Sequence, residues 1–160
     1  MVAVILKSPS TINNMHISRA QKSDLHSIQH LMHLYGKKLT ITESHLNKKD
    51  VALQARNNNG ELVAFMWAGI MANGTMAYID KVVCHPDYAG TGIVRALYAE
   101  ALRIGKQRGV KEAFGIIRQD EHYIKAAANA LKTAFGSDGY NYTYVVADIN
   151  HVIKELQGSI

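Results

Sequence analysis

Two closely spaced glycines after an apolar run are the first feature of this sequence that could do chemistry. Gly90 and Gly92 stand in AYIDKVVCHPDYAGTGIVRALYAEAL, between a strand-like run that ends at Cys84 and a helical pattern that begins near Gly92. Glycines in such a turn let backbone N–H groups converge on an anion, and the helix N-terminus adds unpaired donors and a positive dipole end. The spacing indicates a pyrophosphate cradle, with a simple packing turn as the alternative. No Lys-Ser or Lys-Thr follows, which argues against a P-loop.

Histidine and cysteine give weaker signals. His26, His30 and His33 recur at i, i+4 and i+7 of a predicted helix, a spacing that metal ligands can have, but no cysteine or carboxylate cluster joins them. A partly exposed helix face is the favoured interpretation, and we predict no metal site. Cys84 and His85 are neighbours on a strand and point to opposite faces, so they cannot form a nucleophile–base pair. We expect Cys84 to be a small buried residue.

The segment HPDYAGTGIVRAL strongly resembles the acyl-CoA-binding motif of the GNAT superfamily of N-acyltransferases, usually written Val-x-His/Asn-Pro-x-Tyr-Arg/Gln-x-x-Gly-Ile-Gly/Ala. The flanking segments agree with the same family. MHISRAQKSDL is similar to its first strand and helix start, and FGSDGYNYTYVVADI to its closing helix end, glycine–aromatic turn and last strand. The resemblance covers about Met15 to Ile149, and it implies the GNAT fold, acetyl-CoA as cosubstrate and acetyl transfer to an amine.

The resemblance also implies which residues bind the cofactor. Backbone groups of Val82, Val83 and Cys84 would pair with the pantetheine arm as with a neighbouring strand. A separation between this strand and the strand over Glu112 to Ile117 would leave room for the thioester. The pyrophosphate would be wrapped by the residues of the glycine turn and the first helical turn: Gly90, Thr91, Gly92, Ile93, Val94 and Arg95.

Two positions of the motif depart from the family's pattern. Ala89 stands where Arg or Gln is usual, which removes a peripheral phosphate or packing contact. Val94 stands where Gly or Ala is usual, and it adds bulk at the first helical turn. We expect a somewhat weaker or shifted cofactor site that still rests on main-chain donors.

A third departure concerns the general acid. The family often places a tyrosine four residues before the glycine of its Gly-Phe turn, where it protonates the departing thiolate. The equivalent residue here is Phe135 if Gly139 is that glycine, and Lys132 if Gly136 is. Neither is a tyrosine, so water or another residue such as Tyr123 would have to serve.

Amine acetylation requires a neutral amine, so the resemblance also implies a general base near the acceptor. Asp80, four residues before Cys84, lies on the strand where many family members carry Glu or Asp facing the acceptor site. An ion pair with Lys81 or another lysine at a strand edge is the alternative role. In the family the first helix borders the acceptor pocket. The resemblance therefore implies that His26, His30 and His33 could contact substrate.

Periodicity and turn signals predict the elements that position these residues. A helix should begin at Ser23 or Asp24 and end at Gly36, with a weaker helical or irregular piece over Ser44–Lys49. Asn73-Gly74 and an Asn-Asn-Asn-Gly segment mark hairpin turns. Two further helices are predicted over Gly92–Arg108 and His122–Ala134. The predicted strands are MHISRA from Met15, Asp50–Arg56, Glu61–Ala72, Thr75–Cys84, Glu112–Ile117 and Tyr142–Ile149.

The element order predicts an α/β fold of the GNAT type. Its central mixed β-sheet would combine an antiparallel meander with a parallel crossover from the fourth strand to the fifth, flanked by helices. A chain of 160 residues without linker or repeat fits a single domain over 1–160, with residues 1–14 as an N-terminal extension. The single cysteine excludes an intrachain disulfide.

Charge and hydropathy limit the kinds of partner that the chain is expected to have. The net charge of +5 favours an anionic partner, and a polyphosphate cofactor satisfies it as well as nucleic acid does. The basic residues are scattered, so nucleic acid is not expected. No apolar run approaches the roughly 18 residues of a membrane span, and no leader is recognised, so we expect a cytoplasmic protein without membrane contact.

Together these features predict an acetyl-CoA-dependent N-acetyltransferase. The acetyl group would pass directly to a primary amine in a ternary complex, with Asp80 as base and backbone N–H groups near Val83 stabilising the oxyanion. The alternative is a GNAT-like module that binds acyl-CoA without catalysis, which Phe135 favours. The acceptor is left open among polyamines, antibiotic amines, protein N-termini and lysine side chains, and so is a homodimer.

Overall fold

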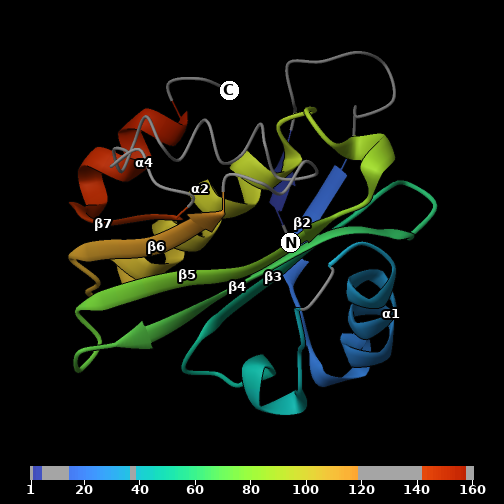
Figure 1. Ribbon diagram of the computed structural model, residues 1–160, viewed down its shortest axis with the longest axis horizontal. Coiled ribbons are helices and arrows are strands. Elements are labelled where there is room, and N and C mark those ends of the chain that lie inside the picture. The colour runs from blue at the N-terminus through green and yellow to red at the C-terminus, as the bar shows by residue number, and fades with distance from the viewer. Residues whose placement is uncertain (1, 5–14, 37–38, 119–141, 158–160) are drawn as a thin grey trace.

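The computed structural model describes residues 2–4, 15–36, 39–118 and 142–157 (Figure 1). Within them the strands form one mixed sheet in the order β1 to β7. The strands are β1 (Val2–Val4), β2 (Met15–Arg19), β3 (Val51–Arg56), β4 (Leu62–Met71), β5 (Met76–Cys84), β6 (Glu112–Arg118) and β7 (Tyr142–Asp148). The α-helices are α1 (Leu25–Tyr35), α2 (Ile93–Gln107) and α4 (Ile149–Gln157). Short 3₁₀ turns lie at Lys22–Asp24, Glu43–Leu46 and Pro86–Tyr88.

The predicted meander is confirmed, because β2 to β5 pair antiparallel in chain order. In the β4–β5 turn, Ala72, Asn73 and Gly74 have φ angles of 53°, 55° and 88°. This left-handed conformation is the one that Asn-Gly hairpin turns require. In the β3–β4 turn, the side-chain oxygen of Asn57 accepts the backbone N–H of Glu61. Both turns therefore lie where the sequence signals predict them.

The ends of α1 also agree with the prediction. At its start, the Asp24 carboxylate accepts the backbone N–H of Gln21 at 2.9 Å and pairs with Arg56 at 3.1 Å. Asp24 is the N-cap residue of α1, where its carboxylate complements the helix dipole without a side-chain hydrogen bond to the first turn. At its end, a Cβ on Gly36 would lie 2.7 Å from the carbonyl oxygen of Met32, so only glycine fits.

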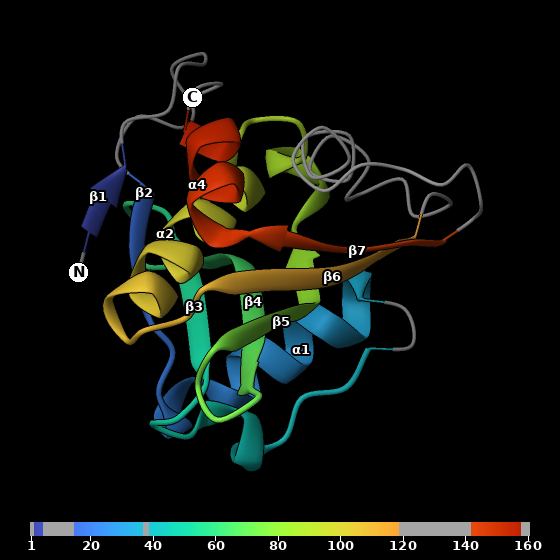
Figure 2. The same cartoon turned by 90° about the vertical axis from the view of Figure 1, so that its left-hand side faces the viewer.

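Helices lie on both faces of the sheet (Figure 2), and each face carries its own apolar core. Helix α1 covers one face, over buried residues that include Phe65 and Val83. Helices α2 and α4 cover the other face, over residues that include Val82 and Cys84. Because both faces of this part of β5 are buried, a ligand can reach its backbone only along an open edge.

The parallel crossover is confirmed as well. Strand β5 pairs parallel with β6 from Met76 opposite Glu112 to Ile79 opposite Gly115, and α2 connects the two. Strand β6 continues beyond this ladder to Arg118 and pairs there with β7. The two parallel strands are therefore joined over only part of their length.

Two of the described strands and α-helices were not predicted. Val2–Val4, within the expected N-terminal extension, forms β1 and pairs antiparallel with β2. Helix α4 follows the last strand directly and buries Ile149 and Val152 in the core beneath α2. The predicted helix over His122–Ala134 lies outside the described residues. Among the helices that the structure describes, none has the length and apolar character needed to cross a membrane.

Candidate functional site

The centre of the candidate site is an irregular step in the pairing of β4 with β5. Met66 lies opposite Val82 and Ala68 opposite Ile79, so two residues of β5, Asp80 and Lys81, face the single Trp67 of β4. This is a β-bulge, a feature that re-aims side chains and is frequent beside active sites. Ile79 and Val82 both lie in the α2 core. The two bulge residues between them are therefore displaced from that core.

The carboxylate of Asp80 is partly exposed and has a cationic neighbour. Its side chain is 35% exposed, and its Oδ2 lies 4.0 Å from Nζ of Lys81, whose side chain is 15% exposed. The ion pair proposed as an alternative role is thus present. At this distance and exposure the pair is a weak one, so it leaves the carboxylate available to a ligand.

Trp67, opposite the bulge, is held by its neighbours. Its ring lies over Gly69, where a Cβ would come within 2.8 Å of it, and the edge of His45 meets it with ring centroids 5.0 Å apart. The indole N–H is buried and has no hydrogen-bond partner among the described residues. The Trp67 side chain as a whole is only partly buried and packs against the α1 core.

The edge of β5 that follows the bulge is open toward β6. The parallel ladder ends at Ile79, and no described residue of β6 pairs with the segment from Asp80 to Cys84. Val82, Val83 and Cys84 are 5%, 0% and 0% exposed, so their side chains are committed to the two cores. What they can offer a ligand is their main chain, in the geometry of a strand edge. The separation predicted between these strands is present.

The glycine turn connects this edge to the N-terminus of α2. Gly90 and Gly92 have φ angles of 75° and 92°, a left-handed conformation that side chains disfavour. Gly92 is the N-cap of α2, and its carbonyl accepts the first helical hydrogen bond from Ala96 at 2.9 Å. The amide groups of the first turn of such a helix have no acceptor inside it. The turn therefore has the conformation that an anion cradle needs.

The two residues that depart from the family motif, Val94 and Ala89, lie in different environments. The side chain of Val94 is 7% exposed and belongs to the core between α2 and the sheet. Its added bulk is therefore taken up by the core. Ala89 is exposed and leaves the side of the turn open to solvent.

Cys84 is no nucleophile in this fold. It is fully buried, and desolvation raises the pKa of its thiol to about 12. The ring of His85 lies instead among Tyr35, Asp87 and Tyr88. The prediction that Cys84 and His85 do not form a catalytic pair agrees with this geometry.

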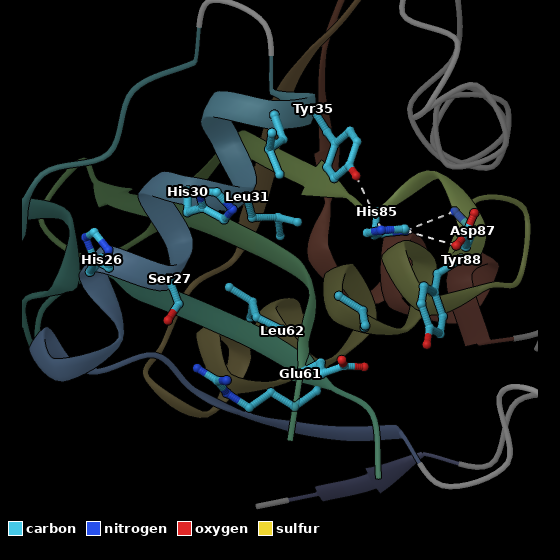
Figure 3. A pocket seen from close by; sticks show the side chains of 13 residues that line it. His26, Ser27, His30, Leu31, Tyr35, Glu61, Leu62, His85, Asp87 and Tyr88 are labelled. Carbon is cyan, nitrogen blue, oxygen red and sulfur yellow. Dashed lines mark hydrogen bonds and ion pairs between the residues drawn. The ribbon is translucent and has the colours of Figure 1, made fainter. Parts of the chain in front are cut away.

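A cleft of about 670 Å³ opens on the α1 face of the sheet (Figure 3). Its walls come from α1, from the start of β4 and from the turn after β5. His26 and His30 line it, whereas His33 does not. No cluster of metal-binding side chains occurs among the described residues. The cleft is lined by His26, Ser27, His30, Leu31, Leu34, Tyr35, Arg56, Glu61, Leu62, Val63, His85, Asp87 and Tyr88.

Comparison with known proteins decides the family. The model of the acetyltransferase (GNAT) family matches residues 19–148, most of the chain. The chain belongs to the GNAT acetyltransferase family. Both its fold class and the resemblance of its glycine motif are thereby confirmed. A search of curated protein sequences found no match.

Solved structures share this GNAT fold at low sequence identity. Aminoglycoside 6'-acetyltransferase type Ii superposes with a TM-score of 0.67 and 15% identity, over 84% of this chain and 97% of that chain. The ribosomal-protein-S18-alanine N-acetyltransferase from Escherichia coli gives 0.64 and 18%, over 84% and 94%. A GNAT acetyltransferase from Staphylococcus aureus Mu50 gives 0.65 and 12%, over 84% and 99%. At such identities the likeness establishes the fold alone.

Sequence reasoning missed two features of the site. The bulge at Asp80 and Lys81 leaves no mark in the apolar alternation of the strand. The cleft depends on contacts such as that between Tyr35 and His85, which are 50 positions apart. Phe135 and Lys132, at the position where the family often has its acidic tyrosine, and Tyr123, the possible substitute, lie outside the described residues.

Proposed function

We propose that this GNAT chain is an acetyl-CoA-dependent N-acetyltransferase that transfers an acetyl group directly to a primary amine in a ternary complex. The observation that carries the proposal is the end of the β5–β6 ladder at Ile79. It opens a strand edge that leads directly into a left-handed glycine turn and a helix N-terminus. A strand edge suits the amides of pantetheine, and the turn suits a pyrophosphate.

Main-chain groups do most of the binding in this proposal. Val82, Val83 and Cys84 would pair with the pantetheine arm through their backbone. The pyrophosphate would lie against the N–H groups of the glycine turn and the start of α2: Gly90, Thr91, Gly92, Ile93, Val94 and Arg95. Because main-chain donors are fixed by the fold, they need no side-chain ordering when the cofactor binds.

Acetyl-CoA supplies the activated acetyl thioester. The amine nitrogen attacks the carbonyl carbon, a C–N bond forms, and the C–S bond breaks with release of CoA. Backbone N–H groups near Val83 would stabilise the charge that develops on the carbonyl oxygen. Asp80 would accept the proton that the amine must lose. The leaving thiolate would take its proton from water or from a group outside the described residues.

The bulge supports the role of Asp80. It lies at the point where β5 and β6 separate, and Asp80, the residue after Ile79, faces away from the α2 core there. A carboxylate so placed lies beside the open edge at which the thioester is expected. The partial exposure of Asp80 leaves room for an acceptor amine to approach it.

Acetyl transfer tests the proposal directly. The purified chain is mixed with acetyl-CoA and with polyamines, aminoglycosides, free lysine or peptides with a free N-terminus, and CoA release is followed with a thiol-reactive dye. We expect release that depends on the amine for at least one class, with the acetylated product found by mass spectrometry. An enzyme that binds acetyl-CoA but acetylates none of these classes would favour the non-catalytic acyl-CoA-binding module. Absence of acetyl-CoA binding would refute both.

A further inference from the structure

The cleft on the α1 face is not part of the proposed reaction centre. Phe65 and Val83 lie opposite each other between the cleft and the bulge, and both are 0% exposed beneath α1. Leu62, at the cleft, is five positions from Trp67 at the bulge, which corresponds to about 16 Å along a strand. The buried core thus separates the cleft from Asp80 on this face.

The fixed charges of the cleft leave an excess of carboxylate. Arg56 is neutralised by its ion pair with Asp24 at 3.1 Å. Glu61 and Asp87 both line the cleft, and the Asp87 carboxylate lies 3.8 Å from Nδ1 of His85. Among the described residues neither forms an ion pair with a lysine or arginine. This acidic balance contrasts with the net charge of +5 of the chain, counted with neutral histidines. A cation in the cleft would face two carboxylates without a competing positive side chain.

The aromatic side chains add a second preference for a cation. Tyr35 and Tyr88 each meet the ring of His85 edge-on, with ring centroids 4.9 and 5.9 Å apart (Figure 3). Aromatic faces attract an ammonium through their quadrupole, most strongly where water is partly excluded. The cleft thus combines carboxylates with an aromatic corner.

Hydrogen bonding fixes the polarity of that corner. The Nδ1 atom of His85 accepts the backbone N–H of Asp87 at 3.1 Å, so a neutral His85 carries its proton on Nε2. That N–H faces the phenolic oxygen of Tyr35 at 3.4 Å. The phenol of Tyr88 accepts in turn from the Asn57 amide at 3.3 Å, and the same amide donates to the Glu61 carboxylate at 2.6 Å. The network holds Glu61 and Tyr88 on one wall of the cleft.

The rest of the cleft is apolar. Leu31 and Leu62 line it, and Leu34 remains 52% exposed beside it. A ligand that covers a large exposed aliphatic side chain removes apolar surface from water, which favours binding. We propose that the cleft binds an organic cation, a protonated amine carried by an apolar or aromatic body, at a site separate from Asp80.

Paired probes that differ only in charge test this inference. Binding of 2-phenylethylammonium and of the neutral 2-phenylethanol is measured by NMR titration of the chain alone, at about pH 8, where unperturbed histidine is neutral. No acetyl-CoA is present, so the outcome does not depend on the proposed acetyl transfer. We expect the ammonium to bind about five- to tenfold more tightly, the value of two exposed ion pairs together with a cation–π contact.

Substitutions assign the preference to the cleft. The double variant Glu61→Gln/Asp87→Asn should reduce the ratio of the two affinities to about two- to threefold, because it removes both ion pairs but keeps the cation–π contact and the shape. Glu43→Gln is the matched control, because Glu43 is an exposed carboxylate paired with Lys22 outside the cleft. Circular dichroism and the melting temperature verify that each variant folds. Equal binding of the two probes, an unchanged ratio in the double variant, or a lack of saturation at about 10 mM would each overturn the proposal.

Discussion

Asp80 has two candidate roles, the proposed general base and the ion-pair partner of Lys81. Its carboxylate lies 4.0 Å from the ammonium of Lys81 and is 35% exposed. A partly exposed pair of this length contributes about 0–1 kcal/mol to stability, too little to explain the bulge by itself. Strand alternation from Ile79 already turns Asp80 away from the α2 core, and the extra residue of the bulge turns Lys81 away from that core as well. The bulge thus brings the carboxylate and its cationic neighbour together at the open edge.

Substitution of Asp80 separates the roles. If it is the base, Asp80→Asn should leave acetyl-CoA affinity unchanged and slow acetyl transfer by about 10²–10⁴-fold. Lys81→Gln is the matched control, because it breaks the same ion pair but keeps the carboxylate, and it should retain most of the turnover. Initial rates and melting temperatures are measured for both variants. Equal losses of stability in the two variants, with turnover intact in both, would show that Asp80 only pairs with Lys81.

Single residues of the site differ in how far the sequence reveals them. The left-handed glycines and the buried Cys84 follow from residue type, because glycine alone enters that conformation easily and a thiol packs as a small apolar group. The bulge at Asp80 does not follow from residue type, because an extra residue in a strand is recognised only when its pairing with the partner strand is known. Glu61 carries no signal either, because its neighbours in the cleft come from distant segments.

Among the elements, the β5–turn–α2 unit joins the open edge to the turn proposed to bind the pyrophosphate. Strand β5 ends at Cys84, and α2 begins one residue after Gly92, whose φ of 92° and ψ of 0° turn the chain toward the helix. The amides of the first helical turn have no acceptor inside the helix, as the proposed pyrophosphate site requires. The conformation of Gly92 is therefore expected to control cofactor affinity more than any side chain of the turn.

Gly92→Val tests this element. A β-branched residue is strained at this φ and adds bulk beside the expected phosphates, so acetyl-CoA affinity should fall at least about tenfold, or 1.4 kcal/mol. Gly74→Val is the control, since Gly74 has a similar φ of 88°, has no atom within 4 Å of its Cβ position, and lies in the β4–β5 turn. It should share the loss of stability and keep the affinity, as measured by calorimetry. Equal affinities for both variants would place the pyrophosphate elsewhere.

The elements that the sequence predicts are those with strong local signals. The meander and α1 have turn or cap residues at their ends, and these act within a few residues. Strand β1 has only three residues, and its pairing with β2 is a long-range contact. Helix α4 did have a local signal, because the Asp148 side chain accepts the N–H groups of Asn150 and His151 as an N-cap would. That signal was hidden by the strand pattern that runs directly into it.

At the scale of the whole molecule, Cys84 reports on the integrity of the fold. It is 0% exposed in the core between the sheet and α2, and burial raises the pKa of its thiol to about 12. Because the folded pKa lies above that of the unfolded chain, the neutral thiol favours the folded state below about pH 9. This contribution is lost as pH rises from about 9 toward 12, at up to about 1.4 kcal/mol per pH unit.

Acetyl-CoA should therefore protect Cys84 from a thiol-reactive dye. At about pH 8 the folded chain has almost no thiolate, so labelling requires opening of the core, and the reagent reacts mainly with open molecules. A cosubstrate that binds only the folded state at a hundredfold excess over its Kd should slow labelling about 100-fold, which corresponds to about 2.7 kcal/mol. NAD at the same concentration should have little effect.

The dependence of the labelling rate on urea shows how large the opening is. A steep increase of the rate with urea would identify the opening as global, because the slope is proportional to the surface area exposed on opening. Rapid labelling of the native chain would contradict the burial of Cys84, and equal rates with and without acetyl-CoA would contradict the proposed cofactor site.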